Sequence, residues 1–198
     1  MIFALSGSHG IGKTSIFNLL KKHHLLKDYI FLPEVARGLA NILGKEPKVF
    51  LCNTDPYIRF MWENLVNDIT CFSYYVYLEL GYKTKNLQVI PKALIVSDRS
   101  FIDTLAYSKV YLDPERFNYI YYKIKHAYKL NKLDIFTFLL RSKDREDEYI
   151  AFYIKEFLKE FNLPFKEFNI PTGKNSKEIY NINFRLSNYL AEEIRLIY

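Results

Sequence analysis

Residues Ser6–Thr14 ("SGSHGIGKT") have the types and spacing of a phosphate-binding loop. Four residues separate Gly7 from the Gly12-Lys13-Thr14 run, which is the spacing of a P-loop. Glycines here allow backbone angles that let successive N–H groups turn inward onto an anion. The lysine is expected to reach terminal phosphates, and the threonine hydroxyl to ligate Mg²⁺. The predicted nucleotide-binding residues are Gly7, Ser8, His9, Gly10, Ile11, Gly12, Lys13, Thr14 and Ser15.

The flanks of this loop support the P-loop interpretation. The apolar run "IFAL" precedes it and suits a buried strand, whereas "SIFNLLKK" follows with apolar residues at helical spacing. Strand, loop and helix in this order are the context that the motif needs. As a loop residue, Lys13 is expected to be exposed and to pack little.

Strand-like and helical patterns alternate along the whole chain, which predicts an α/β fold with a parallel sheet covered on both faces. Such a sheet binds ligands at the carboxyl ends of its strands, so the residues after each strand are the candidates for chemistry. The predicted strands are residues 2–5, 29–33, 93–97, 135–140 and 165–169. The predicted helices are residues 13–24, 34–43, 55–82, 101–110, 114–130, 145–161 and 176–196.

A glutamate and an arginine follow the second predicted strand, in "PEVARGLA". Glu34 stands at the strand end and Arg37 comes three residues later. A carboxylate that faces a phosphate loop can hydrogen-bond an acceptor hydroxyl or remove its proton. The alternative is a helix N-terminal glutamate that interacts with the helix dipole. We favour a catalytic role for Glu34 and expect Arg37 to contact the substrate.

An Asp-Arg pair follows the third predicted strand. Asp98 ends a buried apolar strand, where an unpaired carboxylate is costly, so a cation such as Mg²⁺ is expected beside it. Arg99 has a planar guanidinium that can bind phosphate through two hydrogen bonds. The alternative is a structural ion pair at a loop entrance. We predict Asp98 and Thr14 as the magnesium ligands and Arg99 as a catalytic residue.

Two arginines follow the fourth predicted strand, in "RSKDREDEY". Arg141 and Arg145 are four residues apart, so on a helical turn they share a face. As a lid at about 141–150, they could close over phosphates and neutralise charge in the transition state. The charge pattern alone favours a solvated run instead. Both arginines remain candidate catalytic residues.

The long helical segment at 55–82 is rich in aromatic residues, most of which are expected in the core. One or two rings could form the wall of an acceptor pocket, where a flat ring stacks on a base. Its polar residues could hydrogen-bond an acceptor, and Arg59 is the substrate-binding candidate among them.

Length and composition narrow the class of protein. At 198 residues, the whole of 1–198 is expected to form a single domain. The net charge of +6 comes without a basic block with interleaved aromatics, so no nucleic acid partner is expected. No apolar stretch reaches about 18 residues, which argues against a membrane span. Cys52 and Cys71 lack metal or disulfide spacing, so we expect a cytoplasmic protein. The oligomeric state stays open, with a homodimer as one option.

Three segments together resemble the nucleoside and nucleotide kinases of the thymidylate kinase-like P-loop class: "SGSHGIGKT", "SDRSFIDTLAYS" and "RSKDREDE". The second is the sharpest likeness, with matching positions at Asp98, Arg99, Asp103, Thr104, Ala106 and Tyr107. "PEVAR" is similar to the nicotinamide riboside kinase domain of bifunctional NAD regulators and to AAA-type ATP-binding proteins related to it. Deoxynucleoside kinases share a strand-end glutamate base and an Arg-x-x-x-Arg lid.

The resemblance implies a P-loop NTPase fold, with a five-stranded parallel sheet in the order 2-3-1-4-5 and helices on both faces. It also implies ATP- and Mg²⁺-dependent phosphoryl transfer to a small acceptor, a nucleoside or nucleoside monophosphate. Asp103 and Tyr107 become substrate-binding candidates on this basis. The second strand lacks the Arg-Glu-Pro-Gly pattern of thymidylate kinases, so the acceptor stays open. The alternatives are a P-loop ATPase or GTPase module acting on a macromolecular partner, and a nucleotide-binding protein without catalysis.

Overall fold

The computed structural model describes residues 1–83, 94–131, 133–142 and 147–197. Within these residues, five strands form a sheet in the order β2-β3-β1-β4-β5, and every neighbouring pair is parallel. This confirms the predicted order 2-3-1-4-5. The strands are β1 (Ile2–Ser6), β2 (Ile30–Leu32), β3 (Ile95–Ser97), β4 (Ile135–Arg141) and β5 (Phe165–Asn169).

The first strand is the centre of the sheet. Ile2 of β1 is in register with Ile95 of β3 on one side and with Ile135 of β4 on the other. All five residues of β1 are buried, because helices cover both faces. Successive side chains alternate between two apolar clusters, with Ile2 in one and Phe3 in the other, as the period of a strand requires. The short apolar run in the sequence is therefore a fully buried strand.

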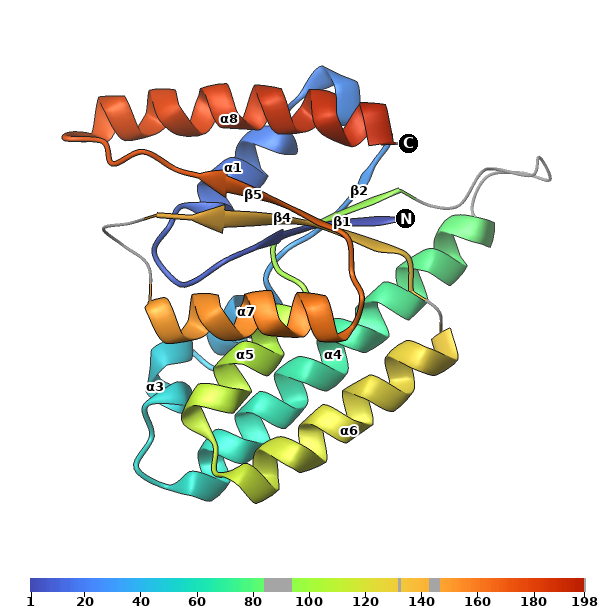
Figure 1. Ribbon diagram of the computed structural model, residues 1–198, viewed down its shortest axis with the longest axis vertical. Coiled ribbons are helices and arrows are strands. Elements are labelled where there is room, and N and C mark those ends of the chain that lie inside the picture. Colours follow the sequence, from blue (N-terminus) through green and yellow to red (C-terminus); the bar gives the residue numbers. More distant parts are fainter. Residues whose placement is uncertain (84–93, 132, 143–146, 198) are drawn as a thin grey trace.

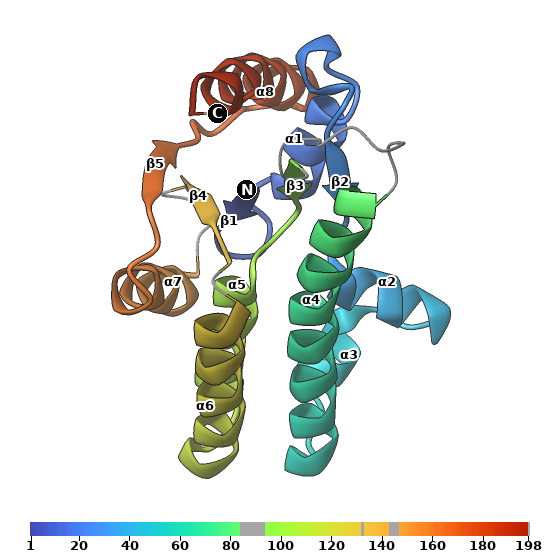
Figure 2. The same cartoon turned by 90° about the vertical axis from the view of Figure 1, so that its right-hand side faces the viewer.

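The helices divide between the two faces of the sheet (Figure 1). On one face lie α1 (Lys13–Leu20) and α8 (Ser176–Ile197). On the other lie α4 (Pro56–Lys83), α5 (Phe101–Tyr111), α6 (Pro114–Asn131) and α7 (Glu148–Glu160). Two short helices, α2 (Val35–Ile42) and α3 (Pro47–Leu51), lie against α4 (Figure 2). In the described ranges, no helix has the length and apolar character needed to cross a membrane.

Helix boundaries follow local capping chemistry. The pair Asp113-Pro114 begins α6 as the sequence predicts, since the Arg116 N–H donates to Asp113 Oδ1 at 3.1 Å. The short helix α3 is missing from the sequence prediction, because its five residues bury no side chain and carry no periodic signal. Helix α1 ends at Leu20, and a 3₁₀ turn at His24–Leu26 follows where the sequence predicts more α-helix.

The first glycine of the P-loop packs against the end of β4. Gly7 has a φ of 149°, and a β-carbon added there would lie 2.5 Å from the Leu140 carbonyl oxygen and 2.3 Å from Ile11 Cδ1. Gly10 also has a positive φ, of 82°, but nothing lies within 4 Å of the corresponding point. Both positions favour glycine for backbone reasons, but only Gly7 is also required by close packing.

We therefore expect Gly7→Ala to be clearly more destabilising than Gly10→Ala. The Gly10 variant should lose about 1 kcal/mol through backbone strain, whereas the Gly7 variant should lose a further 1–3 kcal/mol or so through overpacking. Urea denaturation of both variants measures this difference. Equal losses in the two variants would contradict the close approach of Gly7 to β4.

Candidate active site

The P-loop is fixed by a carboxylate from another part of the chain. Asp103, in the first turn of α5, is completely buried. Its Oδ2 accepts hydrogen bonds from Ser6 Oγ at 2.6 Å and from the Ser100 N–H at 2.9 Å, and its Oδ1 accepts from the Gly7 N–H at 3.0 Å. The same carboxylate therefore closes the capping box of α5 and holds the start of the P-loop. With both oxygens engaged in this way, we expect Asp103 to position the loop instead of contacting substrate.

Lys13 differs from the exposed loop lysine that the sequence predicts. It is the first residue of α1 and is only 5% exposed, because its ammonium group turns onto the loop. Nζ donates to the carbonyl oxygens of Gly7 at 2.7 Å and Ser8 at 2.6 Å. Burial, with a smaller contribution from the charge of Arg99, lowers the pKa of Lys13 to about 7. An anion bound in the loop would favour the charged form again.

The other predicted P-loop residues occupy different environments. Ser8 is buried and its hydroxyl accepts from the Asp147 N–H, while Ile11 lies in the core beneath the loop. His9 is exposed at the cavity described below, and burial, Arg99 and Lys13 together lower its pKa. Ser15 faces away from that cavity, into a shallower hollow between α1 and α8 that Asn183 also lines.

Thr14 and Asp98 meet at the carboxyl edge of the sheet. Asp98 directly follows β3, and its side chain is almost completely buried. Burial raises the pKa of Asp98, while a hydrogen bond from the Thr14 side chain acts against this shift. Among the described residues, Asp98 Oδ1 has no hydrogen-bond partner. A hydroxyl beside a buried carboxylate with a free oxygen is a donor set that fits Mg²⁺.

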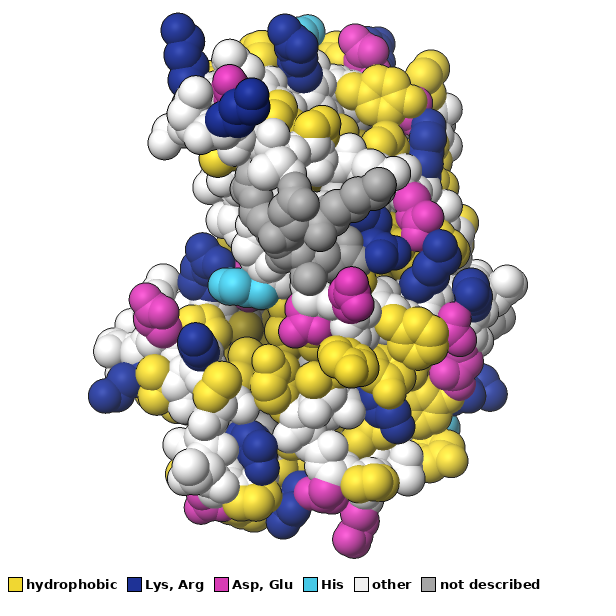
Figure 3. Space-filling view, turned by 60° about the vertical axis from the view of Figure 1, so that its left-hand side comes forward, with side chains coloured by type: hydrophobic (Ala, Val, Ile, Leu, Met, Phe, Trp, Pro, Cys, Tyr) yellow, Lys and Arg dark blue, Asp and Glu magenta, His cyan; other side chains and the backbone are white. Residues whose placement is uncertain are grey.

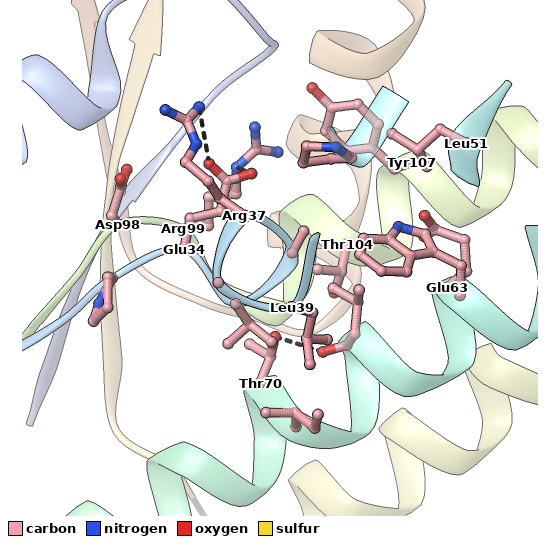
Figure 4. Close-up of a pocket in the computed structure, with 18 of the residues that line it drawn as sticks. Glu34, Arg37, Leu39, Leu51, Glu63, Thr70, Asp98, Arg99, Thr104 and Tyr107 are labelled. Carbon is pink, nitrogen blue, oxygen red and sulfur yellow. Dashed lines mark hydrogen bonds and ion pairs between the residues drawn. The ribbon is translucent and has the colours of Figure 1, made fainter. Parts of the chain in front are cut away.

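Glu34 and Arg99 form a buried ion pair across neighbouring strand ends. Glu34 is the N-cap residue of α2 but makes no capping hydrogen bond; its Oε1 instead lies 3.0 Å from Arg99 Nε. Its Oε2 lies 3.4 Å from Arg37 Nη2 (Figure 4). Arg37 is half exposed, whereas the other two side chains are buried or nearly so. The carboxylate thus faces guanidinium groups, which a role limited to the helix dipole does not require.

Arg99 is held in a backbone conformation that side chains disfavour. Its φ is 118°, in a region that costs a non-glycine residue roughly 1–3 kcal/mol. The Arg99 carbonyl oxygen accepts hydrogen bonds from Tyr74 Oη at 2.7 Å and from Ser97 Oγ at 2.6 Å. The guanidinium lies 5.1 Å from the centre of the Tyr107 ring. These contacts hold the guanidinium beside Glu34 and do not pair it with Asp98.

A cavity of about 730 Å³ opens beside this ion pair. Figure 3 views the molecule from the side where the strands end and shows hydrophobic side chains gathered across its lower half, with charged ones around them. One end of the cavity carries the polar and charged side chains of His9, Glu34, Arg37, Asp98 and Arg99. The rest is lined mainly by apolar and aromatic side chains from α2, α3, α4 and α5, among them Leu39, Leu51, Trp62, Val66, Tyr74, Tyr107 and Tyr111. The size and lining suit a small molecule with a polar end and a flat apolar end.

A buried polar network joins α4 to α5, and two of its members, Glu63 and Thr104, line the cavity. No role was predicted for Glu63 or Ser108 from the sequence. Ser108 Oγ donates to Glu63 Oε2 at 2.7 Å, and Thr104 Oγ1 donates to Asn67 Oδ1 at 2.6 Å. Asn67 Nδ2 donates to the Glu63 carbonyl at 2.8 Å. Glu63 and Asn67 are four residues apart on α4, and Thr104 and Ser108 are four residues apart on α5. In the sequence, these residues are polar positions at helical spacing on otherwise apolar helix faces.

The remaining predicted residues lie in different places. Arg141 ends β4, with Nη1 3.7 Å from Glu167 Oε1 on β5. Arg145 lies outside the described residues, and so does the middle of the predicted lid. Where the lid joins α7, the Asp147 N–H donates to Ser8 Oγ at 3.2 Å, so this end of the segment touches the P-loop. Arg59 of α4 is not among the described residues that line the cavity.

The parallel sheet in the order 2-3-1-4-5, with a P-loop after its central strand, defines a P-loop NTPase fold of the kinase-like class. The chain belongs to a family described as an AAA domain, whose model matches residues 2–171. No curated protein that was compared with the chain matches it.

Solved structures share this fold at low sequence identity. A thymidylate kinase from Ehrlichia chaffeensis superimposes with a TM-score of 0.51 and 15% identity, over 96% of this chain and 98% of that chain. NadR protein in complex with NR superimposes with a TM-score of 0.55 and 15% identity, over 96% of this chain and 50% of that chain. NadR protein in complex with NAD and AMP-PNP superimposes with a TM-score of 0.51 and 17% identity, over 93% of this chain and 48% of that chain. The chain thus spans about half of each NadR chain, and the expected likeness to P-loop kinases is confirmed.

The buried contacts of Asp103 predict a measurable effect on the loop. Asp103→Asn replaces one acceptor oxygen by an amide that cannot accept from its present donors. We expect a loss of about 1.5–3 kcal/mol in the free energy of unfolding, and weaker ATP binding because the loop is no longer held.

A matched control is Asp113→Asn at the start of α6. Asparagine caps helices as well as aspartate does, and Asp113 is exposed, so this variant should be nearly silent. Thermal melts and nucleotide titrations of the two variants test the comparison. Similar behaviour of both variants would contradict the role assigned to Asp103.

Proposed function

We propose that this protein is a P-loop kinase that transfers a phosphoryl group from ATP, with Mg²⁺, to a hydroxyl of a small acceptor of the nucleoside or nucleoside monophosphate class. The observation that carries the proposal is the position of the Glu34–Arg99 ion pair. It lies at the charged end of a largely apolar cavity of about 730 Å³, which His9 of the P-loop also lines. A base beside a phosphate-binding loop and a pocket large enough for an acceptor are the parts that such a transfer needs.

The donor phosphates would bind in the P-loop. Its backbone N–H groups and the ammonium of Lys13 supply positive charge, and Asp103 holds the loop in shape. The Thr14 hydroxyl and the Asp98 carboxylate would hold Mg²⁺, which neutralises phosphate charge when it is bound. The free Oδ1 of Asp98 supports this role, because a buried carboxylate oxygen without a partner is costly.

The acceptor hydroxyl would bind at the charged end of the cavity. Glu34 would accept its proton or orient it, and Arg99 would bind the phosphoryl group between donor and acceptor. When phosphate draws the guanidinium away, the carboxylate of Glu34 becomes available to the hydroxyl. Arg37, half exposed at the same carboxylate, would contact an acceptor phosphate or sugar.

Arg141 and Arg145 would close over the donor phosphates. The contact between Asp147 and Ser8 supports this role, since the described end of the lid segment already touches the P-loop. Closure would exclude water, so hydrolysis of ATP without an acceptor should be slow. Tyr107, whose ring lies beside the Arg99 guanidinium, would form part of the acceptor wall.

The test is a screen of acceptors with Mg-ATP. Purified protein is incubated with nucleosides, nucleoside monophosphates or nicotinamide riboside, and ADP release is measured. We expect one acceptor class to raise the rate well above the rate without acceptor. Lys13→Ala, checked for folding by its melt because Lys13 is buried, should lower this rate at least about a hundredfold. A rate that no small acceptor changes but a macromolecule stimulates would support the ATPase module instead.

Glu34→Gln separates a catalytic carboxylate from a structural one. The amide keeps the size of the side chain but cannot act as a base, so kcat should fall by about 10²–10⁴ while ATP affinity changes little. Steady-state kinetics at saturating acceptor measure the effect.

The control for this variant is Glu115→Gln. Glu115 is also a carboxylate in the first turn of a helix, α6, and it lies outside the cavity, so it reports the effect of helix charge alone. Its turnover should be unchanged. If Glu34→Gln also keeps normal turnover and only melts earlier, Glu34 is a helix-end carboxylate and has no part in the transfer.

A further inference from the structure

A second carboxylate lies in the cavity, away from the ion pair at its charged end. Glu63 of α4 is 3% exposed and lines the cavity (Figure 4), as does its chain neighbour Trp62. Its Oε2 is held by Ser108 Oγ at 2.7 Å. The neighbouring walls are aromatic or aliphatic, from Trp62, Val66 and Tyr111. This is the part of the cavity that would surround a flat ring.

Glu63 forms no ion pair in the part of the chain that the structure describes. Glu34 at the other end of the cavity pairs with two arginines, whereas no lysine or arginine forms a salt bridge with Glu63. Within the same residues, the hydrogen bond to the Glu63 carboxylate comes from Ser108 and goes to Oε2. A buried carboxylate with one engaged oxygen is costly unless a ligand supplies the missing donor. If Glu63 served only to join α4 to α5, a neutral side chain that accepts from Ser108 would suffice.

We propose that Glu63 is a specificity-determining residue: it accepts a hydrogen bond from an N–H group on the ring of the acceptor and disfavours a ring that carries a negative charge there. The inference rests on the proposed function, since it deepens the choice of acceptor in the same cavity. Ligand N–H groups of this kind occur on carboxamides and on exocyclic amines of nucleobases. A carboxylate in the same position would be repelled by Glu63 and left without a donor.

The protonation of Glu63 supports this assignment and makes the pH dependence of ligand binding a readout for it. Burial raises the pKa of Glu63 to about 7, and the hydrogen bond from Ser108 offsets part of the shift. The groups that face Glu63 from neighbouring elements are Arg99 and Tyr111, and neither titrates between pH 6 and 8 because the pKa of each lies above its usual value. With a pKa near 7, the ionised fraction of Glu63 rises about tenfold between pH 6 and pH 8.

The experiment measures binding of defined probes to the full chain by calorimetry, without ATP, at pH 6, 7 and 8. The first pair is nicotinamide riboside, which carries a carboxamide, and nicotinic acid riboside, which carries a carboxylate in its place. The second pair is cytidine, with an exocyclic amine, and uridine, with a carbonyl there. The two pairs distinguish a carboxamide from a nucleobase amine as the source of the N–H group.

For the wild type, the N–H-bearing member of one pair should bind at least about tenfold more tightly than its partner, with an affinity that rises about tenfold from pH 6 to pH 8. Glu63→Gln should weaken that probe by about 10–100-fold at pH 8 and remove the pH dependence. Ser108→Ala should move the rise in affinity to higher pH, because the hydrogen bond that lowers the pKa of Glu63 is lost. Glu156→Gln, an exposed isosteric control on α7, should behave as the wild type.

The outcomes separate this inference from the proposed function. Equal binding of both members of each pair, or a pH dependence that Glu63→Gln retains, overturns the role of Glu63 even if phosphoryl transfer is observed. Binding that follows Glu63 as expected, with no ADP release on addition of Mg-ATP, supports the role of Glu63 and contradicts the kinase. If Glu63→Gln does not fold, Ser108→Ala carries the test, and an unshifted pH profile in that variant overturns the inference.

Discussion

The carboxylate of Asp103 is the contact on which the rest of the site depends. It accepts hydrogen bonds from Ser6 and Gly7, where β1 runs into the P-loop, and from the Ser100 N–H at the N-terminus of α5, so it joins two segments that lie more than 90 residues apart in the sequence. Because these donors are buried, the carboxylate cannot be exchanged for water without cost. The loop, the Asp98–Arg99 turn and the helix that forms one wall of the cavity are therefore fixed relative to one another. The residues that would carry out chemistry inherit their geometry from this contact.

The cavity contains two carboxylates in opposite environments. Glu34 faces Arg99 and Arg37 and stays near the region of phosphate chemistry, whereas Glu63 lies among aromatic walls with only a hydroxyl donor. The arginines stabilise the ionised form of Glu34, whereas the ionised form of Glu63 depends on a donor that a bound ligand would supply. For the proposed acceptor, the two carboxylates would be recognition points of different character, one at its reacting end and one at its ring. Aromatic side chains, among them Trp62 and Tyr74 of the long helix α4, line the same cavity.

Much of the fold could be predicted from the sequence, because a P-loop after a short apolar run and strand-end polar residues are local signals. Glu34 and Asp98 could be singled out for the same reason, since a strand end in a parallel sheet is a position that sequence can locate. The burial of Lys13 and the loop-holding contacts of Asp103 could not, because both depend on which carbonyl and amide groups the loop presents after folding. Glu63 was missed because its partner Ser108 is on another helix, and the four-residue spacing of polar positions on each helix does not show that the two helices face one another at a cavity.

The backbone at Arg99 has a consequence for how this protein could be altered. Residue 99 has a φ of 118°, which glycine adopts freely and arginine does not. A search for stabilising substitutions guided by backbone geometry alone would rank glycine first at this position. That choice would remove the guanidinium that faces Glu34, so thermostability and chemistry pull in opposite directions at one residue. Engineering of this scaffold would have to leave that conflict in place and gain stability elsewhere, for example on the exposed side of α8.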